Sequence, residues 1–421
     1  MNRTVILVES GNRGAEIPSF RKLGFNVIYI HSGVIPYEQD NIAQANKIIF
    51  DKGIIQYERL AEIISELHNL CTIETICSTS DFFITSVCRL CEKYGYRSLN
   101  SNIAATFHYK NKFREKQRKF HYNVPDFYSF EDLTVAVQFY NNAEKKEWIF
   151  KPVNGNESVA VQLVQSEQEL RDCYKQLKYL SRYTGSLLSP SFLLEEYIVG
   201  NIYSCEFIVS DGQFQVFGVT NRLMSELPYF VELGYSFPVY GDVAELVIEE
   251  TKRFIKDFQY NFGPCHIEYI VSPDNKIYIL EVNPRLIGPP NPWMIDRALG
   301  ISVFDTICSL YITGEILEPV NYATNYSACL EVTSPVSGYL RQLHIDSNYL
   351  ARNDAHVILM KEKEEYINSA TSNTDILARI LTTADTIHGA QKLAKEIYDN
   401  IRLDVSIKPR ELSAQNVGWL I

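Results

Sequence analysis

The chain has 421 residues, of which 51 are acidic and 40 are basic, so its formal net charge is −11. Hydrophobic residues make up 46% of the sequence and charged residues 22%, values that exclude a disordered chain and are typical of a globular protein. An acidic chain has no general attraction for phosphodiester backbones, so the composition disfavours a nucleic-acid-binding protein. The length predicts two to four domains, each able to bury its own core.

The sequence offers no segment for a membrane. Its first apolar run, Val5–Val8, ends at Glu9 and is too short for a signal-peptide core or a transmembrane helix. The nine cysteines are scattered, which is typical of reduced thiols, so we expect a cytoplasmic protein with no membrane partner. Cys88 and Cys91 form a CxxC without a second pair at zinc-site spacing, which favours buried structural cysteines over a metal or redox site.

The first hundred residues alternate between predicted strands and helices, a pattern that indicates a parallel, Rossmann-like sheet. We expect strands at Thr4–Glu9, Phe25–His31 and Ile73–Ser78, and helices at Ala15–Leu23 and Glu58–Leu70. The turn Gly11–Gly14 lacks a full GxGxxG pattern, so we interpret it as a tight strand-to-helix turn and not as a dinucleotide site.

A basic segment, Tyr109–His121, opens the next part of the acidic chain and is by itself typical of a solvated helix face. A strand at Glu147–Val153 carries Lys151 and leads into a small polar loop, Asn154–Ser158, and a second strand. Further strands are expected at Phe192–Ile198, Tyr203–Ser210 and Phe214–Val219, and antiparallel strands beyond Ala328 precede a helix at Asp385–Asn400 and a strand at Leu403–Ile407.

The segment from His266 to Arg285 carries the strongest signal. Two apolar, β-rich runs flank Ser272–Lys276, which predicts a β-hairpin. If Asp274 and Asn275 form the loop centre, Glu268 lies directly opposite Glu281, and His266 lies opposite Asn283. A register slip of one residue would separate the two acids, and a solvated hairpin with incidental acids is the plain alternative.

Facing side chains of an antiparallel pair lie about 4.5–5.5 Å apart at Cβ, so two carboxylates held there repel each other unless a cation lies between them. Asn283 shares the strand face of Glu281 and adds an amide oxygen. One or two Mg²⁺ ions suit such a donor set, since Mg²⁺ takes few carboxylates together with substrate phosphates. Arg285 follows as a cation that can stabilise transferring phosphoryl oxygens.

Taken together and in order, these segments resemble the ATP-grasp superfamily over nearly the whole chain. The resemblance rests on Lys112, Lys151-Pro152 with its loop, Glu195–Ile198, Glu268 and Glu281–Arg285. Within that superfamily the sequence is most similar to carboxylate–amine ligases related to the bacterial L-amino-acid ligases, through Tyr229–Pro238 and Glu281–Gly300.

The resemblance implies roles for individual residues. The positions matching ATP contacts are Lys112, Lys151, Gly155, Ser158, Glu195, Glu196, Tyr197 and Ile198. Glu268, Glu281 and Asn283 match the ligands of two Mg²⁺ (or Mn²⁺) ions, and Arg285 matches the catalytic arginine that stabilises the tetrahedral intermediate.

Three positions depart from the family pattern. Ile202 stands where many relatives have a ribose-binding glutamate, Asn111 stands where an aspartate usually precedes the lysine, and the phosphate loop has Gly155 as its one glycine.

Four further positions are candidates for substrate contact. Glu232 lies in an apolar-aromatic stretch and is expected either to bind a substrate amine or to be an ordinary surface acid. His266 faces Asn283 near the expected metals, although a structural histidine is favoured. Gly288 and Trp293 belong to the loop after Arg285, where Trp293 either walls the pocket or packs in the core.

We therefore expect a mixed α/β and α+β chain with an ATP-grasp fold: a Rossmann-like pre-ATP-grasp domain near 1–105, an ATP-grasp domain near 106–320 and a C-terminal α+β domain near 321–421. The expected activity is an ADP-forming ligase that joins an amino acid or similar carboxylate to an amine through an acyl phosphate, giving an amide or dipeptide. A biotin-carboxylase-like or purine-precursor enzyme, and a non-catalytic nucleotide-binding relative, remain alternatives. A homodimer is common in the resembled family.

Overall fold

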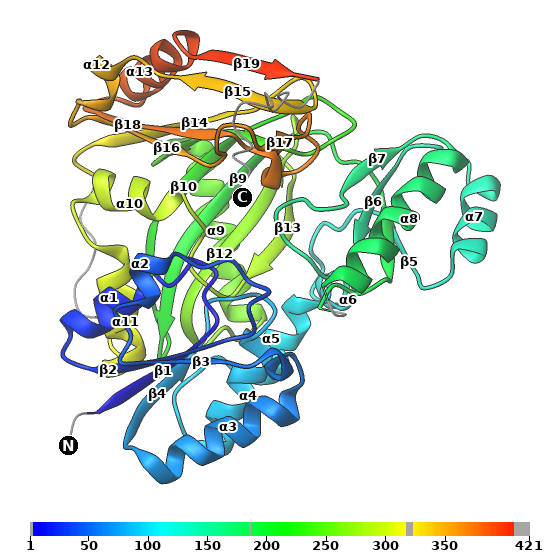
Figure 1. The fold of residues 1–421 in the computed structure, drawn as a ribbon. Helices are drawn as coiled ribbons and strands as arrows, with labels where there is room; N and C mark the ends of the chain where they lie inside the picture. The colour runs from blue at the N-terminus through cyan, green and yellow to red at the C-terminus, as the bar shows by residue number, and fades with distance from the viewer. Residues whose placement is uncertain (1–2, 185–186, 317–322, 408–421) are drawn as a thin grey trace, which may run out of the picture.

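The computed structural model describes residues 3–184, 187–316 and 323–407 (Figure 1). Within these residues the strands form four sheets. Among the helices of the described part, none combines the length and the apolar composition needed to cross a bilayer.

The N-terminal sheet is parallel and has the strand order β3-β2-β1-β4, which confirms the predicted Rossmann-like sheet. Its strands are β1 (Thr4–Val8), β2 (Asn26–His31), β3 (Lys47–Phe50) and β4 (Ile73–Cys77), and its helices are α1 (Glu16–Lys22), α2 (Gln39–Ile42), α3 (Tyr57–Leu70) and α4 (Ile84–Tyr94), with a short 3₁₀ helix, η1 (Lys52–Ile55). Every residue of β1 is buried, because helices cover both faces of the sheet. The edge strand β3 was not predicted, since its apolar run, Ile48–Phe50, is only three residues long and its side chains are mostly exposed.

Eight of the nine cysteines are buried in this fold. Cys88 and Cys91 are both buried on α4, which confirms their structural role, and all nine cysteines are unpaired. Burial raises the pKa of Cys88 well above its usual range and that of Cys91 to about 12, so neither thiol is a ready thiolate.

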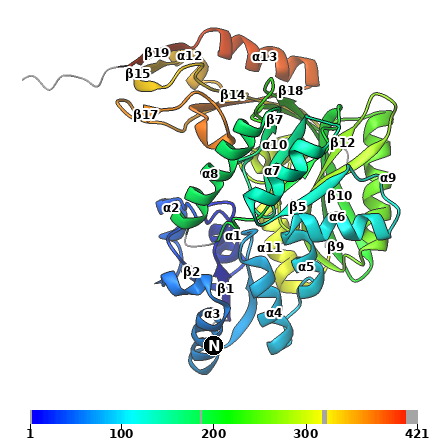
Figure 2. The same ribbon diagram turned by 90° about the vertical axis from the view of Figure 1, so that its right-hand side faces the viewer.

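A small antiparallel sheet follows two connecting helices, α5 (Ser101–His108) and α6 (Lys110–Lys119). Its strand order is β5-β8-β6-β7. The strands are β5 (Phe127–Phe130), β6 (Trp148–Pro152), β7 (Gln162–Val164) and β8 (Phe192–Glu195), and the helices α7 (Leu133–Asn142) and α8 (Glu167–Tyr183) lie side by side over them (Figure 2). This sheet presents the polar loop between β6 and β7 toward the rest of the molecule.

The largest sheet has eight antiparallel strands in the order β13-β12-β9-β10-β11-β14-β18-β16. They are β9 (Asn201–Ser210), β10 (Gln213–Met224), β11 (Glu232–Phe237), β12 (Phe262–Val271), β13 (Ile277–Asn283), β14 (Tyr326–Val332), β16 (Ala355–Leu359) and β18 (Ala378–Ala384). Its last three strands follow residue 320, so one sheet continues across the boundary that we predicted between the second and third domains.

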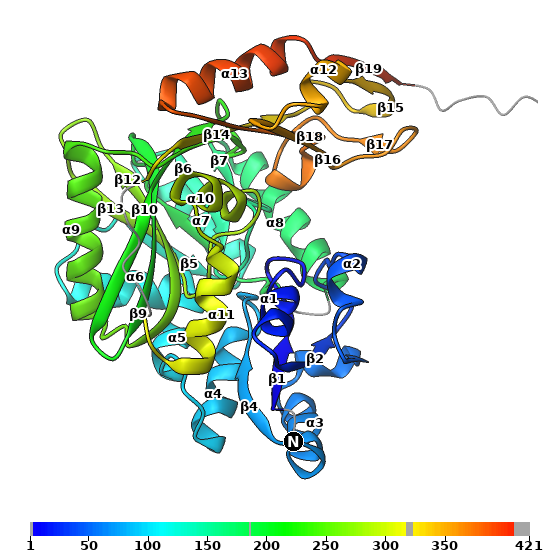
Figure 3. The same cartoon turned by 90° about the vertical axis from the view of Figure 1, so that its left-hand side faces the viewer.

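Helices cover the large sheet unequally. Helix α9 (Asp242–Asp257) packs on one face of β9, β10 and β12, and α10 (Asn291–Leu299) and α11 (Val303–Thr313) lie on the other (Figure 3). Helix α13 (Ile387–Asp399) packs on β14 and β18. A three-stranded sheet, β17 (Tyr366–Ile367), β15 (Gly338–His344) and β19 (Arg402–Ser406), completes the C-terminal part with α12 (Ser347–Leu350) and a 3₁₀ turn, η2 (Asn373–Asp375).

The hairpin of β12 and β13 contains a β-bulge that decides its register. Val271 pairs with Ile277, one residue away from the pairing expected for a loop centred on Asp274 and Asn275. Leu280 is then left over as an extra residue, and beyond it Glu268 faces Glu281. The predicted facing of the two acids is therefore confirmed, although the loop that we assumed is not the one that produces it.

A second bulge lies between β10 and β11. Leu223 pairs with Gly234, whereas the next residue, Met224, pairs with Glu232, so Leu233 is the extra residue. An inserted residue shifts the alternation of side chains between the two faces of a sheet. Both bulges thus turn a glutamate to the face of the sheet that α9 does not cover.

Candidate functional site

A cavity of about 820 Å³ lies where the N-terminal sheet, the small sheet and the open face of the large sheet meet. It is lined by the loops that follow β1 and β4, by the loop between β6 and β7, by the segment after β8, and by η2. Fourteen of the sixteen predicted site residues line it: Lys151, Gly155, Ser158, Glu195, Glu196, Tyr197, Ile198, Glu232, His266, Glu268, Glu281, Asn283, Arg285 and Gly288. The structure therefore gathers side chains that are more than 130 positions apart in the sequence.

Lys112 is one of the two predicted residues that the cavity does not include. Its side chain is exposed, and its Nζ lies 4.6 Å from the ring centroid of Tyr109. Helix α6 buries Phe113 and Arg114, so Lys112 falls on the outer face of its first turn. Lys110 lines the cavity instead: its Nζ donates to the carbonyl of Gly155 over 3.1 Å and lies 3.3 Å from Oε1 of Glu281.

Trp293 is the other residue outside the cavity lining. It packs against the buried cluster formed by α10, α11 and the N-terminal sheet, and its ring stacks on that of His356 with 6.3 Å between centroids. The pocket-wall interpretation of Trp293 is therefore wrong, and the alternative of core packing holds.

A buried ion cluster lies at the end of the cavity beside the small sheet. Lys151 Nζ lies 2.5 Å from Glu195 Oε2, and Arg114 Nε donates to Glu195 Oε1 over 3.0 Å. Burial lowers the pKa of Lys151 to about 8, which outweighs the attraction of Glu195. Burial alone would raise the pKa of Glu195, but the charges of Arg114 and Lys151 hold it below its usual range. Glu195 is thus ionised and shared between two cations.

Arg114 is a site residue that sequence reasoning missed. It is almost fully buried, and its two Nη atoms donate to the carbonyls of Ile279 and Leu280 over 2.9 Å each. Leu280 is the extra residue of the hairpin bulge, so Arg114 satisfies the backbone groups that the bulge frees. The only available signal was its place within a basic helical segment, which read as a solvated face.

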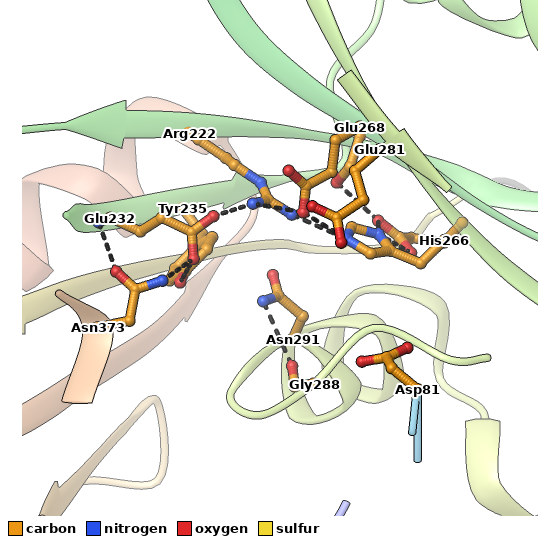
Figure 4. Close-up of polar contacts among 12 residues, drawn as sticks. Asp81, Arg222, Glu232, Tyr235, His266, Glu268, Glu281, Gly288, Asn291 and Asn373 are labelled. Atoms are coloured by element: carbon orange, nitrogen blue, oxygen red, sulfur yellow. Dashed lines mark hydrogen bonds and ion pairs between the residues drawn. The ribbon is translucent and has the colours of Figure 1, made fainter. Parts of the chain in front are cut away.

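Glu268 and Glu281 lie close together in the cavity (Figure 4), and Asn283 also lines it. The attraction of Arg222, 3.1 Å from Glu268, and of His266 holds the pKa of Glu268 far below its usual range despite burial. In the described part of the chain, no cluster of three or more His, Cys, Asp or Glu side chains is arranged as a metal site by itself. Two facing carboxylates and an amide oxygen nevertheless fit a hard cation that takes its remaining oxygens from phosphate groups.

His266 lies in the middle of a buried polar network. Its Nδ1 is 3.0 Å from Glu206 Oε2, and its Nε2 is 3.0 Å from Glu268 Oε1 and 3.0 Å from Arg222 Nη2. Although burial by itself lowers the pKa of His266, the charge of Glu206 and the hydrogen bonds raise it. Both ring nitrogens have partners, so the geometry favours a structural histidine that also lines the cavity.

Glu232 is held by three neighbours at the far end of the cavity (Figure 4). It forms an ion pair with Arg222, accepts a hydrogen bond from Tyr235 Oη over 2.8 Å, and accepts another from Asn373 Nδ2 over 2.8 Å. Its side chain is 13% exposed, so Glu232 is an oriented cavity acid and not an ordinary surface residue.

Arg285 is fixed by a residue of the N-terminal sheet. Its Nε and Nη2 donate to the two carboxylate oxygens of Asp81 over 2.8 and 2.7 Å. Asp81 follows β4, and the carboxyl ends of parallel strands are where ligands bind in such sheets. That position was the available signal for Asp81, which sequence reasoning did not assign.

Ile202, which departs from the glutamate of many relatives, also lines the cavity.

Comparison with known proteins agrees with this geometry. An ATP-grasp domain model matches residues 144–290. The chain is 23% identical over 317 residues to an uncharacterized protein of Sinorhizobium fredii, y4rH, covering 72% of this chain and 62% of that protein. The chain thus corresponds to less than two thirds of the length of this curated relative.

Among solved structures, the L-amino acid ligase from Bacillus licheniformis superposes with a TM-score of 0.81 at 16% identity, covering 96% of this chain and 99% of that one. Phosphoribosylglycinamide synthetase from Anaerococcus prevotii superposes with a TM-score of 0.70 at 18% identity, covering 96% and 100%. The chain has the ATP-grasp fold, and the predicted fold class is confirmed.

Proposed function

We propose that this ATP-grasp chain is an ADP-forming ligase that joins an amino acid or similar carboxylate to an amine through an acyl phosphate. One observation carries the proposal: a single face of the large sheet presents Glu281, Glu268 and Glu232 to the cavity that Lys110 and Arg285 enter. The likeness in fold to an L-amino acid ligase supports it.

The nucleotide is assigned to the end of the cavity between the small sheet and β13. Glu196 to Ile198 follow β8 and are positioned to border the adenine. Lys110 and Lys151 are positioned for the phosphates, with Gly155 and Ser158 in the covering loop. Lys110 replaces Lys112 in this assignment, because only Lys110 lines the cavity.

Glu268, Glu281 and Asn283 would hold one or two Mg²⁺ (or Mn²⁺) ions together with the nucleotide. When bound, such ions neutralise charge on the phosphoryl oxygens. In the structure, Lys110 contacts Glu281, and Arg222 contacts Glu268, so each acid already lies beside a cation that can balance it.

The chemistry proceeds in two steps. A carboxylate oxygen of the first substrate attacks the γ-phosphorus of ATP, the bond to the β-phosphate oxygen breaks, and ADP leaves. The amine nitrogen of the second substrate then attacks the acyl carbon, inorganic phosphate leaves, and the nitrogen loses a proton to give the amide. These steps need alignment and charge stabilisation more than a covalent enzyme group.

Arg285 is assigned to the oxygens that gain charge in both steps. Its guanidinium is mostly buried and is oriented by Asp81, so it needs little rearrangement as the charge develops. Glu232 is assigned to the ammonium group of an amino-acid substrate, since it is an oriented carboxylate that opens on the cavity.

The nine unpaired cysteines, eight of them buried, support a reducing compartment such as the cytoplasm.

The decisive experiment is an incubation of the purified protein with Mg·ATP and pools of amino acids. ADP and phosphate that appear only with a substrate pool, together with a product of amide mass, would support the ligase. AMP and pyrophosphate would contradict the acyl-phosphate mechanism. Phosphate release that depends on bicarbonate would favour a carboxylase, and nucleotide binding without turnover in any pool would favour a non-catalytic relative.

A further inference from the structure

Asn373 lies where the C-terminal part of the chain meets the cavity, and it contacts two parts of the site at once. Its side chain forms two hydrogen bonds with Glu232 (Figure 4): the Glu232 backbone N–H donates to Asn373 Oδ1 over 2.9 Å, and Asn373 Nδ2 donates to Glu232 Oε2 over 2.8 Å. Its own backbone N–H donates to the carbonyl of Glu157, in the phosphate loop, over 3.2 Å.

The first pair of bonds explains how the bulge at Leu233 is tolerated. An extra residue disrupts the ladder of hydrogen bonds beside it. Glu232 is the residue next to this bulge, and Asn373 takes up its backbone N–H while holding its carboxylate. Asn373 thus fixes both the backbone and the side chain of the proposed ammonium-binding acid.

The third bond holds a loop whose backbone is strained. Glu157, Ser158 and Ala160 have φ of 56°, 54° and 57°, a region that residues other than glycine adopt at a cost. Contacts with the rest of the cavity wall must therefore stabilise this conformation. They include the bonds from Lys110 to Gly155 and from Asn373 to Glu157.

The strand after the loop makes a second connection to the segment before Glu232. Leu163 of β7 donates its backbone N–H to the carbonyl of Pro228 over 2.9 Å, and Gln162 forms a bridge with Tyr229. The segment that contains Pro228 and Tyr229 leads directly into Glu232. The phosphate loop and the substrate acid are thus joined on both sides, through β7 and through Asn373.

Hydrogen bonds fix the short turn that carries Asn373. In the turn that begins at Ser372, Asp375 is buried, and its Oδ2 accepts hydrogen bonds from the backbone N–H groups of Thr371 and Ser372 over 3.0 and 3.1 Å. A capping box of this kind fixes the first residues of a helical turn. Asn373 can therefore act as a fixed point against which the loop is held.

We propose that Asn373 is a positioning residue that couples the closed phosphate loop to Glu232, so that closing the loop over nucleotide also completes the substrate end of the cavity. The substrate half of this inference rests on the proposed function. The loop half does not, because it concerns nucleotide and protein contacts alone.

Two substitutions separate the contacts. Asn373→Ala removes the bonds to Glu232 but keeps the backbone N–H, whereas Asn373→Pro removes both. Proline suits this position, since Asn373 is the first residue of a 3₁₀ turn and the residue before it, Ser372, is extended with φ of −154° and ψ of 171°. Asn368→Ala is the matched control, because Asn368 contacts Asp375 from outside the cavity lining.

The opening of the phosphate loop is measured by its rate of cleavage with a glutamate-specific protease, in the presence of Mg²⁺ and the ATP analogue AMP-PNP. Glu157 is exposed within the loop, and mass spectrometry identifies the fragment ending there. We expect Asn373→Pro to be cut at Glu157 about five times faster than wild type, Asn373→Ala and Asn368→Ala, the effect of one lost backbone hydrogen bond. Equal rates in all four proteins would overturn the loop half.

Hydrogen exchange of wild type provides a second measurement that does not depend on the folding of Asn373→Pro. Mg²⁺ with AMP-PNP should slow exchange of the Asn373 amide, and unchanged exchange would contradict the coupling.

The effect of Asn373 on the substrate end of the cavity is tested by steady-state kinetics, with whichever amino-acid pool supports turnover. Asn373→Ala should raise KM for that substrate about tenfold, with the affinity for Mg²⁺ and AMP-PNP kept, since only the hold on Glu232 is lost. An unchanged KM would overturn this half. If no pool supports turnover while the cleavage pattern appears as expected, the proposed ligase function fails and the coupling of Asn373 to the loop stands.

Discussion

Asp81 and Arg285 form a bidentate ion pair at the cavity. The loop after β4 supplies the carboxylate, and the segment after β13 supplies the guanidinium. The two residues are separated by 204 positions in the chain. Such a pair fixes both the place and the plane of the guanidinium, which a single hydrogen bond would not do. The orientation of the proposed catalytic arginine therefore depends on the N-terminal sheet.

Replacing Asp81 by Asn should lower turnover of the ligase reaction about 10- to 100-fold, because Arg285 loses a charged partner and its fixed orientation. We expect the melting temperature to fall by only a few degrees. Turnover would be measured as substrate-dependent phosphate release. Asp274→Asn, on the exposed hairpin loop, is the matched control, and equal turnover in the two variants would contradict the positioning role.

Glu281→Gln and Arg285→Ala should each abolish most turnover while the protein stays folded. The first removes a carboxylate assigned to hold the metal ions, and the second removes the cation assigned to the reacting oxygens. Circular dichroism would establish folding, and ADP production would establish activity. Near-normal rates in both variants would overturn the site assignment.

Lys110 and Lys112 provide a matched pair on the same turn of helix α6. Lys110→Ala should weaken Mg·ADP binding about tenfold or more, since Lys110 lines the cavity and contacts the phosphate loop. Lys112→Ala should bind Mg·ADP as wild type does. Titration calorimetry measures both affinities, and the reverse outcome would restore the role that sequence resemblance implied for Lys112.

Arg114→Met should destabilise the protein by about 3–5 kcal/mol, because Glu195 and the carbonyls of the bulge lose a fully buried partner. Urea unfolding followed by fluorescence gives the free energy of unfolding. Arg118→Met serves as the control, since Arg118 lies one turn further along the same helix and is exposed. If both variants lost the same stability, Arg114 would have no special role in holding the bulge.

Glu331 predicts a pH dependence of stability. It is buried beside Arg379, 3.2 Å from its Nε, and burial raises the pKa of Glu331 from 4.5 to about 7 despite that arginine. The folded protein therefore holds this proton more tightly than the unfolded chain does. The resulting stabilisation is full below pH 4.5 and is lost as the pH rises through about 7.

Glu331→Gln cannot ionise, so its melting temperature relative to wild type should rise by about 2–4 °C between pH 5 and pH 8. Calorimetry at both pH values measures the change, with Glu58→Gln on the exposed face of α3 as the control. A difference between Glu331→Gln and wild type that is independent of pH would contradict this origin of the dependence.

The sequence predicted the parts of the site that lie on one hairpin or on one strand and its loop. Glu268 and Glu281 are brought together by local pairing, and the segment from Lys151 to Ser158 is a strand and its loop. Side-chain alternation and β-propensity determine such features within about twenty residues. The β-bulge at Leu280 was invisible, because its extra residue is a leucine that fits either strand face.

The missed residues contribute through tertiary contacts. Asp81, Arg114 and Asn373 lie in three separate parts of the chain, and each looks like an ordinary polar residue of a loop or helix. Their roles depend on which partner each one meets, and no periodicity in a single sequence encodes that. Lys112 shows the converse. The family resemblance selected Lys112, but helix α6 turns its side chain outward, and the nearby Lys110 lines the cavity instead.

The two β-bulges are places where the strands can tolerate a change of chain length. Removing Leu233 would leave Met224 paired with Glu232, and removing Leu280 would leave Glu268 paired with Glu281, because the pairing on either side of each bulge is already in register. Either deletion would restore regular alternation and keep the glutamate on the face that α9 does not cover. A single-codon deletion at either leucine is therefore expected to preserve the face that the acids take, whereas a deletion at a paired residue such as Val282 would move the residues beyond it to the opposite face.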